Sequence, residues 1–291
     1  MCVTCGCSDG SQPTLTNLQT GTVEAIAPPG NQPEHTHVLA DGTVVSHTHS
    51  NHHHHPESDK NLEMHARMHG TTIALEHKIL AKNDLIAAQN RDWLRGRNIL
   101  ALNLVSSPGS GKTTLLTRTI ADLQGQIPIS VIEGDQETAN DARRIQATGC
   151  PVVQVNTGTG CHLEATMVER GLHTLNPPLN SLVLIENVGN LVCPALFDLG
   201  EQAKVAILSV TEGEDKPIKY PHMFRASQVM ILTKIDLLPY LNFEVDRCLA
   251  YARQVNPGLQ IFQVSATTGA GLQNWYDWLV QTQAGMGQRA G

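Results

Sequence analysis

The stretch SSPGSGKTT, residues 106–114, predicts the fold of this chain. An apolar run, ILALNLV, stands directly before it, and an amphipathic run, TTLLTRTIADL, begins at its end. A glycine-rich turn that joins a strand to a helix is the setting of a phosphate-binding loop, because the N–H groups of the turn and the helix N-terminus face one anion. Ser106 stands where the usual pattern has glycine, and the alternative interpretation is a glycine-rich turn that matches by chance.

We expect six residues of this loop to contact the phosphates of a nucleotide: Gly109, Ser110, Gly111, Lys112, Thr113 and Thr114. The two glycines let backbone N–H groups turn inward around the phosphates. Lys112 is expected to reach the β- and γ-phosphates, and the hydroxyl of Thr113 is expected to bind Mg²⁺. Lys112 is therefore also a candidate catalytic residue.

Short apolar runs follow one another from residue 98, and stretches of helical character separate them. The runs are ILALNLVSS, ISVIEGD, PVVQVNTG, SLVLIENVG, KVAILSVTEG, QVMILTKID and LQIFQVSAT. Strands that are apolar almost throughout and alternate with helices indicate an α/β fold, with a mainly parallel sheet and helices on both faces. With the phosphate loop, this pattern predicts a P-loop NTPase domain over residues 98–285. Ligands of such folds bind beyond the carboxyl ends of the strands.

Two acidic residues stand at such strand ends. Asp135 ends the run VIEGD, and Glu186 lies in IENVG. Carboxylates there can hold Mg²⁺, directly or through water, or orient the attacking water of a hydrolysis reaction. We therefore predict that Asp135 and Glu186 act with Lys112 in catalysis, and that Asp135 and Thr113 are Mg²⁺ ligands. The alternative for each acid is a solvated loop residue.

Two further strand ends indicate which base is bound. The sequence TKID is similar to the NKxD signature of GTPases, with Thr233 in place of Asn. Asp236 can accept hydrogen bonds from the N1–H and the exocyclic amine of guanine, a pair of donors that adenine lacks. Lys234 would pack on the purine, and the backbone N–H groups of Ser265 and Ala266, in VSATTG, would hold the guanine O6. These residues favour GTP and GDP over ATP.

Residues 1–60 differ in composition from the rest of the chain. They are rich in Gly, Pro, Thr, Asn and His and have no sustained apolar periodicity. Because such a segment cannot bury enough apolar surface to offset its loss of conformational entropy, we expect it to be flexible and mostly disordered. Apolar residues at roughly helical spacing then predict a helical lead-in over residues 61–97, before the P-loop domain.

Histidines are concentrated in SHTHSNHHHH, residues 46–55, after the spaced pair His35 and His37. Three interpretations are open: an engineered tag, a polar linker, and a segment that holds metal ions. A tag usually stands at a chain end, whereas this run is internal. Neutral imidazoles bind nickel, copper and zinc, and flexible spacing lets several ions bind without one defined site.

The N-terminal sequence MCVTCGC is the first of two candidate metal-ligand sets. It places Cys2, Cys5 and Cys7 close together, and in a reducing compartment clustered thiolates indicate a soft metal rather than disulfides. Square-planar ligation would suit Ni²⁺, and tetrahedral ligation would suit Zn²⁺. The alternative is three thiols without a metal role. Cys150 and Cys248 have no such neighbours and are predicted to be buried as small hydrophobes.

The second set consists of Cys161 and His162 in GTGCHLEATM, together with Cys193 in NVGNLVCP. The adjacent pair stands at the start of a predicted helix, where two neighbouring side chains can face one point. Taken by itself, such a set is more typical of structural residues. Its position favours a functional role, because Cys193 follows Glu186 in the segment that is expected to respond to the γ-phosphate.

Composition and charge exclude other classes of protein. The chain of 291 residues has a formal net charge of −7 and a pI of about 6.0, which argues against nucleic-acid binding. No apolar run is long enough to span a bilayer, and the first residues lack the basic and apolar regions of a secretory signal. We therefore expect a cytoplasmic protein that contacts neither nucleic acid nor membrane.

Taken together, the motifs resemble one family. The N-terminal CxxCxC, the His-rich segment, NLVSSPGSGKTT, EGDQET, GCHLEA, ENVGNLVCP, TEGEDKPIKYP and KIDLLPY are similar to the HypB family, GTPases that help to insert nickel into [NiFe]-hydrogenase. The resemblance implies a dimeric GTPase, related to the UreG class, with a nickel-binding N-terminal motif. It also implies a metal site at the dimer interface, whose ligands fall on Cys161, His162 and Cys193. The implied partners are a HypA-type accessory protein and the hydrogenase large-subunit precursor, and the implied ligands are GTP/GDP, Mg²⁺, Ni²⁺ and Zn²⁺.

The resemblance implies that GTP hydrolysis is coupled to delivery of nickel to the precursor, with the His-rich segment as an added nickel store. Two other functions remain open at this point: a metal store whose nucleotide fold only regulates it, and a sister accessory GTPase for urease or a cobalamin enzyme. The combination of Lys112, Thr113 and Asp135 favours hydrolysis over storage alone. The two metal-ligand sets disfavour the sister GTPase.

Overall fold

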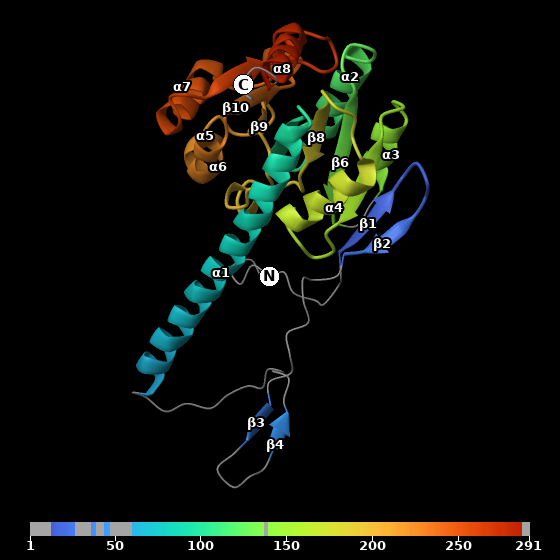
Figure 1. Ribbon diagram of the computed structural model, residues 1–291. Coiled ribbons are helices and arrows are strands. Elements are labelled where there is room, and N and C mark those ends of the chain that lie inside the picture. The colour runs from blue at the N-terminus through green and yellow to red at the C-terminus, as the bar shows by residue number, and fades with distance from the viewer. Residues whose placement is uncertain (1–12, 27–35, 39–43, 47–59, 137–138, 287–291) are drawn as a thin grey trace.

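The computed structural model describes residues 13–26, 36–38, 44–46, 60–136 and 139–286 (Figure 1). Its core is a nine-stranded sheet in the order β11–β10–β9–β5–β8–β6–β7–β1–β2. Seven of these strands coincide with the predicted apolar runs: β5 (Leu100–Ser106), β6 (Ile129–Asp135), β7 (Val152–Asn156), β8 (Leu182–Glu186), β9 (Ala203–Ser209), β10 (Val229–Thr233) and β11 (Gln260–Gln263). Neighbours among these seven are all parallel, as predicted.

The strand order places the predicted motifs at one edge of the sheet. β5 lies between β8 and β9, and β6 lies on the far side of β8. Because these strands run in the same direction, their carboxyl ends meet at one edge. The phosphate loop after β5 therefore lies beside Glu186 at the end of β8 and near Asp135 at the end of β6.

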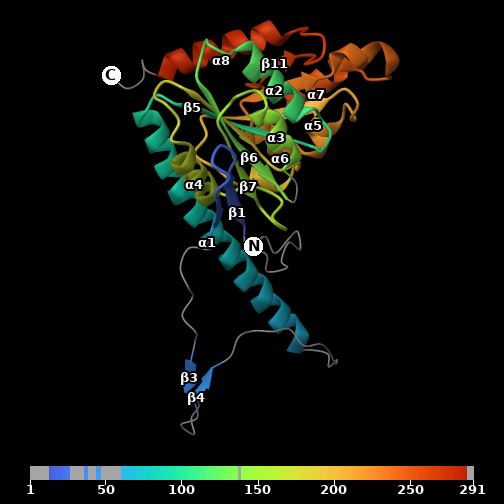
Figure 2. The ribbon, with the colours of Figure 1, turned by 90° about the vertical axis from the view of Figure 1, so that its right-hand side faces the viewer.

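Helices cover both faces of the sheet, as predicted (Figures 1 and 2). They are α1 (Lys60–Gly96), α2 (Lys112–Asp122), α3 (Asn140–Gln146), α4 (Ala165–Leu175), α5 (Lys216–Lys219), α6 (Pro221–Ala226), α7 (Val245–Val255) and α8 (Leu272–Met286), with short 3₁₀ turns η1 (Cys193–Ala195) and η2 (Ile235–Tyr240). α2 and α8 pack in one hydrophobic cluster through Leu116 and Leu279. α1 and α4 pack in another through Leu94 and Leu172, and alternate residues of β5 point to the two sides.

The long helix α1 covers nearly all residues of the expected helical lead-in. Its C-terminal part packs on α4 and the sheet, whereas its N-terminal part extends away from the domain (Figures 1 and 2). None of the helices in the described ranges is long and apolar enough to cross a membrane. Cys150 and Cys248 are buried, as predicted for small hydrophobic residues.

The N-terminal region contains a hairpin that the sequence analysis did not predict. β1 (Thr14–Asn17) and β2 (Val23–Ala25) are antiparallel, and β1 pairs antiparallel with the edge strand β7. Leu15 and Ile26 are buried against the sheet, at 2% and 4% exposure. The edge of β7 offers unpaired backbone groups to β1, and the two buried apolar side chains hold the hairpin against the sheet. Together these contacts order part of residues 1–60. This hairpin corrects the expectation of a mostly disordered segment at these positions.

A second antiparallel pair lies in the same region, formed by β3 (Thr36–Val38) and β4 (Val44–Ser46). The predicted metal ligands Cys2, Cys5 and Cys7 lie outside the described residues, as do His35 and the run of histidines from residue 47 to 55. The predictions for these residues therefore remain predictions.

Candidate nucleotide and metal site

A cavity of about 530 Å³ opens at the carboxyl edge of the sheet, and we call it the nucleotide cavity. The phosphate loop, residues 106–114, forms its floor, and Asp135, Glu186 and Lys234 are among the other lining residues. Its volume is in the range that holds ligands of nucleotide size. Gly109 and Gly111 have φ values of +75° and +90°, which only glycine adopts readily, and Gly111 caps the N-terminus of α2. The loop thus has the backbone that the sequence predicted.

Glu186 binds the first turn of α2 inside this cavity. Its Oε1 accepts a hydrogen bond from the hydroxyl of Thr113 at 2.6 Å and from Nζ of Lys112 at 3.0 Å. Nζ of Lys112 also donates to the carbonyl oxygen of Asn187 at 2.6 Å. Lys112 and Glu186, two of the predicted catalytic residues, are therefore in direct contact, and Thr113 contacts the same carboxylate.

The same carboxylate offers a place for a divalent cation. Among the described residues, Oε2 of Glu186 is buried without a hydrogen-bond partner. A buried acceptor without a partner is costly, and a hard cation would satisfy it. The hydroxyl of Thr113 lies on the other oxygen of this carboxylate, and Asp135 lines the same cavity. The oxygen ligands present therefore fit Mg²⁺.

Glu133 is a residue of this cavity that the sequence analysis missed. It lies on β6 directly opposite Glu186 in the strand register and is 2% exposed. Burial, together with repulsion from Glu186 and Asp135, raises the pKa of Glu133 to about 9. At neutral pH the Glu133 side chain is therefore protonated and adds no negative charge beside the phosphates. An acid inside the apolar run ISVIEGD was the signal that could have found it.

The loop after β10 is joined to the phosphate loop. Lys234 has a φ of +59°, and its Nζ donates to the carbonyl oxygen of Gly109 at 2.7 Å. The hydroxyl of Thr233 donates to the carbonyl oxygen of Ser110 at 2.6 Å. Thr233, which departs from the usual Asn, thus also contacts the phosphate loop.

The predicted base-binding residues lie on two adjacent loops. The N–H of Ile235 donates to the carbonyl oxygen of Val264, which brings TKID beside VSATTG. Oδ1 of Asp236 is buried and has no partner within the part of the chain that the structure describes, so an acceptor is available there. The N–H of Ser265 donates to Ala270 within its own turn, so it would bind a base only if this turn rearranged.

The second predicted metal-ligand set comes together as a cluster, which we call the metal triad. One ligand atom from each of Cys161, His162 and Cys193 lies within 4.8 Å of the other two. Cys161 and His162 lie in the loop before α4, rather than on the helix itself, and Cys193 begins η1. Sγ of Cys161 is 3.6 Å from Nδ1 of His162. Two thiols and one imidazole form a soft set that suits nickel or zinc.

The ring of His162 is buried and packed against an aromatic ring. The residue is 7% exposed, and the ring of Phe197 packs on it with 4.0 Å between ring centroids. Burial lowers the pKa of His162 to about 4, so the ring is neutral at physiological pH, as a metal ligand must be. Its Nε2 is buried and makes no hydrogen bond to any described residue. Phe197 is a further residue that sequence analysis missed.

One segment touches both sites. Asn187 directly follows Glu186, and a Cβ built at Gly189, two residues further on, would lie 3.0 Å from Cγ of Pro108 in the phosphate loop. Further along, Nδ2 of Asn190 donates to the carbonyl oxygen of Cys161 at 3.3 Å. The segment then reaches Cys193, so residues 187–193 join the nucleotide cavity to the metal triad.

The sequence is similar to proteins of one family. Residues 100–263, more than half of the chain, match the family described as CobW/HypB/UreG, nucleotide-binding domain. Hydrogenase maturation factor HypB of Escherichia coli strain K12 is 48% identical over 284 residues, which are 96% of this chain and 98% of the relative. The chain belongs to the HypB family of hydrogenase maturation factors. The HypB of Azotobacter chroococcum is 58% identical over 218 residues, 75% of this chain and 71% of that protein.

Two solved HypB structures have the same fold. HypB from Archaeoglobus fulgidus has a TM-score of 0.65 and 36% identity, covering 70% of this chain and 99% of that one. HypB from Helicobacter pylori, solved in complex with nickel, has a TM-score of 0.66 and 35% identity, covering 70% of this chain and 95% of that one. The predicted P-loop fold and the resemblance to HypB are therefore confirmed.

Proposed function

We propose that this protein is a GTP-hydrolysing nickel metallochaperone that delivers nickel to the large-subunit precursor of [NiFe]-hydrogenase. One observation carries the proposal: residues 187–193 contact the phosphate loop at one end and supply Cys193 to the metal triad at the other. A change at the γ-phosphate can therefore alter the distance between Cys193 and the other two ligands. Such an arrangement suits a protein that holds its cargo in one nucleotide state and releases it in another.

The nucleotide half of the proposal rests on the groups in the cavity. Lys112 would neutralise charge that develops on the transferring phosphoryl group, and Asp135 or Glu186 would orient the attacking water. The hydroxyl of Thr113 with the carboxylates of Asp135 and Glu186 would hold Mg²⁺, which supplies positive charge to the phosphates when bound. Asp236 supports guanine, because its buried oxygen matches a donor that adenine lacks.

The cargo half rests on the donor atoms of the metal triad. We propose nickel as the transported ion, with zinc as a competitor for the same two thiols and one imidazole. The N-terminal CxxCxC motif and the His-rich segment would bind further nickel, the latter as a store. The same proposal includes a cytoplasmic location, a homodimer, a HypA-type accessory protein and the hydrogenase precursor as partners.

The test follows nickel and phosphate in one reaction. The nickel-loaded chain is mixed with the hydrogenase large-subunit precursor and GTP, and both phosphate release and nickel in the precursor are measured over time. We expect GTP to promote transfer and Lys112→Ala to stop hydrolysis. Nickel transfer that proceeds equally well without any nucleotide would contradict the proposal and favour a metal store.

A further inference from the structure

A buried ion pair lies beside η1, outside the nucleotide cavity and the metal triad. Nζ of Lys204 is 3.7 Å from Oε1 of Glu201, and the two residues are 6% and 8% exposed. Removing two charges from water is costly, and a pair of well-packed apolar residues would often be as stable. Stability alone therefore does not explain why an ion pair is buried beside η1.

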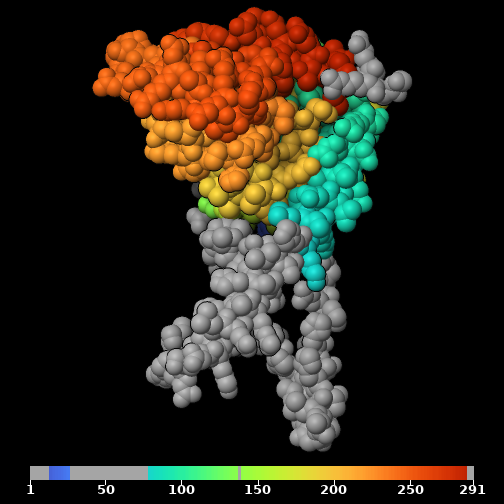
Figure 3. Space-filling model, turned by 90° about the vertical axis from the view of Figure 1, so that its left-hand side faces the viewer, coloured from blue at the N-terminus to red at the C-terminus, as the bar shows by residue number. Residues whose placement is uncertain are grey.

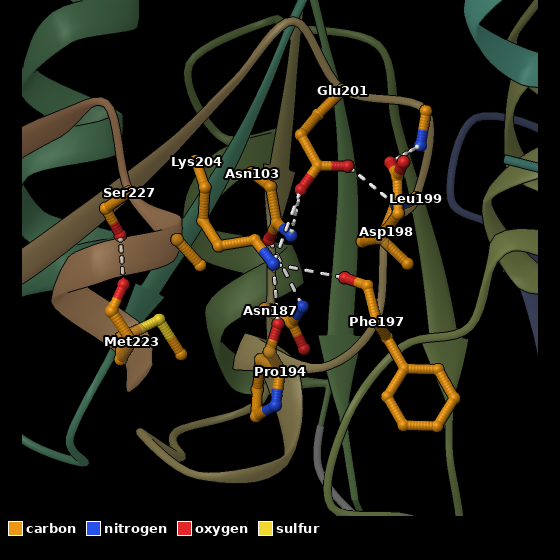
Figure 4. A network of polar contacts seen from close by, with 12 residues as sticks. Asn103, Asn187, Pro194, Phe197, Asp198, Leu199, Glu201, Lys204, Met223 and Ser227 are labelled. Atoms are coloured by element: carbon orange, nitrogen blue, oxygen red, sulfur yellow. Dashed lines mark hydrogen bonds and ion pairs between the residues drawn. The ribbon is translucent and has the colours of Figure 1, made fainter. Parts of the chain in front are cut away.

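Lys204 holds the turn that carries Cys193 (Figure 4). Its Nζ donates to the carbonyl oxygen of Pro194 at 2.7 Å and to that of Phe197 at 3.1 Å. Pro194 directly follows Cys193, and the ring of Phe197 packs on His162. One ammonium group thus binds the backbone within this turn, at Pro194, and just after it, at Phe197.

Glu201, the acidic member of the ion pair, is linked by hydrogen bonds to the loop that carries His162. Oε1 of Glu201 accepts a hydrogen bond from Nδ2 of Asn103 at 3.0 Å, and Oδ1 of Asn103 accepts one from Nδ2 of Asn187 at 3.2 Å. Oδ1 of Asn187 in turn accepts one from the backbone N–H of Leu163 at 3.1 Å. A continuous series of hydrogen bonds, joined by the Glu201–Lys204 ion pair, therefore runs from the backbone next to His162 to the backbone next to Cys193.

The middle of this series contacts the phosphate-binding lysine. The carbonyl oxygen of Asn187 accepts a hydrogen bond from Nζ of Lys112 at 2.6 Å. Because the phosphates of a nucleotide attract the same ammonium group, nucleotide binding competes with this contact. The hydrogen bond that Asn187 accepts from Lys112 therefore depends on whether a nucleotide occupies the cavity.

We propose that Asn103, Asn187, Glu201 and Lys204 form a positioning network that sets Cys193 relative to Cys161 and His162 and that transmits the state of Lys112 to the metal triad. The network supplies no ligand to the metal. It acts on the backbone that carries the ligands, and it rests on the proposed function because it assumes nickel on the triad.

The burial of the network explains why it can carry this role. Asn103 and Asn187 are 0% and 1% exposed, and the side-chain oxygen and amide nitrogen of each take part in hydrogen bonds. A buried polar network in which the groups are satisfied is rigid and specifies one arrangement. Outer groups that orient metal ligands typically change metal affinity by about 10–100-fold when they are removed.

The test uses the full-length chain with Cys2, Cys5 and Cys7 changed to serine, which we call the parent. Ni²⁺ is titrated, and the thiolate-to-nickel charge-transfer absorption is followed, since histidines alone do not produce it. The test variant is Glu201→Gln with Lys204→Met, which removes both charges and leaves no uncompensated ion in the interior. The control is Lys82→Met, the same chemical change at an exposed position on α1.

Each titration is run once with GDP and once with a non-hydrolysable GTP analogue. We expect the double variant to bind nickel about 10–100-fold more weakly than the parent. We also expect the ratio of its nickel affinities in the two nucleotide states to approach one, a result that a merely structural role would not give. Lys82→Met should behave as the parent does.

The outcomes separate the two proposals. If the folded double variant keeps both the affinity and the nucleotide ratio of the parent, the network has no positioning role. A parent that shows no thiolate-to-nickel absorption at all contradicts the metal site of the proposed function, and the network with it. Circular dichroism of the double variant establishes that it is folded before either conclusion is drawn.

Discussion

Lys112 and Glu186 form a buried ion pair at the floor of the nucleotide cavity, with 3.0 Å between Nζ and Oε1. Their side chains are 12% and 2% exposed, so solvent screens the pair little. A nucleotide phosphate must share or take over this ammonium group, while Oε2 of Glu186 remains available to a cation. The pair therefore places Lys112, the predicted phosphate-binding lysine, in contact with the strand end that leads to Cys193.

Lys112→Ala should abolish GTP hydrolysis. Removing a donor that stabilises transition-state charge typically costs about 10²–10³-fold in rate, and Lys112 also binds the phosphates. Nickel binding by the CxxCxC motif should persist, because the two sites share no residue. Steady-state phosphate release measures the effect, with Lys82→Ala as the exposed control. Turnover near the wild-type rate would remove Lys112 from the mechanism.

Asp236→Asn should weaken GTP binding and shift preference toward xanthine nucleotides. The amide offers a donor, which matches the second carbonyl of xanthine but not the amine of guanine. A mismatched buried polar group costs about 1–3 kcal/mol. Competition of GTP and XTP for a fluorescent nucleotide measures the shift, and Asp246→Asn, on the exposed side of α7, is the control. Equal competition by GTP and ATP in the unmutated protein would contradict the guanine assignment.

Gly200→Ala should loosen the contact between α1 and the metal-site loops. Gly200 has a φ of +91°, and its added Cβ would lie 2.6 Å from the carbonyl oxygen of Ala87 on α1. Nδ2 of Asn90, also on α1, donates to the carbonyl oxygens of Ala165 and Leu199. Figure 3 shows the C-terminal part of α1 lying against the domain.

Gly125→Ala is the matched control for this change. Gly125 has a φ of +81°, and no described atom lies within 4 Å of its added Cβ. Both variants should lose about 1–2 kcal/mol to left-handed strain, and Gly200→Ala a further 1–3 kcal/mol or so to overpacking. Urea unfolding compares the two. If the two variants had equal free energies of unfolding, α1 would be able to move away from the added Cβ at Gly200 without a measurable cost.

Deleting residues 35–55 should lower the number of nickel ions bound per chain without changing GTP turnover. The segment contains the spaced histidines and the run of four consecutive histidines. Its residues are mostly polar and contribute little to a hydrophobic core. Metal analysis after gel filtration gives the stoichiometry. An unchanged number of nickel ions would identify the segment as a linker.

The sequence predicted the phosphate loop and the seven parallel strands because local signals specify both. Gly109 and Gly111 mark a loop that needs positive φ, and each apolar run is long enough to identify a buried strand. The metal triad was predicted from the position of Cys193 after Glu186 and from the family resemblance. A hairpin was missed because β1 and β2 are short and largely polar, and their order depends on the edge of β7.

The positioning network shows why other parts could not be predicted. Asn103 and Lys204 stand inside the apolar runs of β5 and β9, where the sequence does not indicate which residues they will contact. Asn187 and Glu201, the hydrogen-bond partners of Asn103, lie 84 and 98 residues further along the chain. Only the folded sheet brings these side chains together.

The central claim is that the nucleotide cavity and the metal triad are coupled. By thermodynamic linkage, an ion on the triad must change nucleotide affinity by the same factor as nucleotide changes ion affinity. The direct measurement is the ratio of GDP affinity to GTP-analogue affinity, determined with and without Ni²⁺ in the chain whose Cys2, Cys5 and Cys7 are serine. We expect nickel to change this ratio a few-fold, which corresponds to about 1 kcal/mol, and Cys193→Ala to erase the change. The same ratio with and without nickel would contradict the account and leave the triad a structural site.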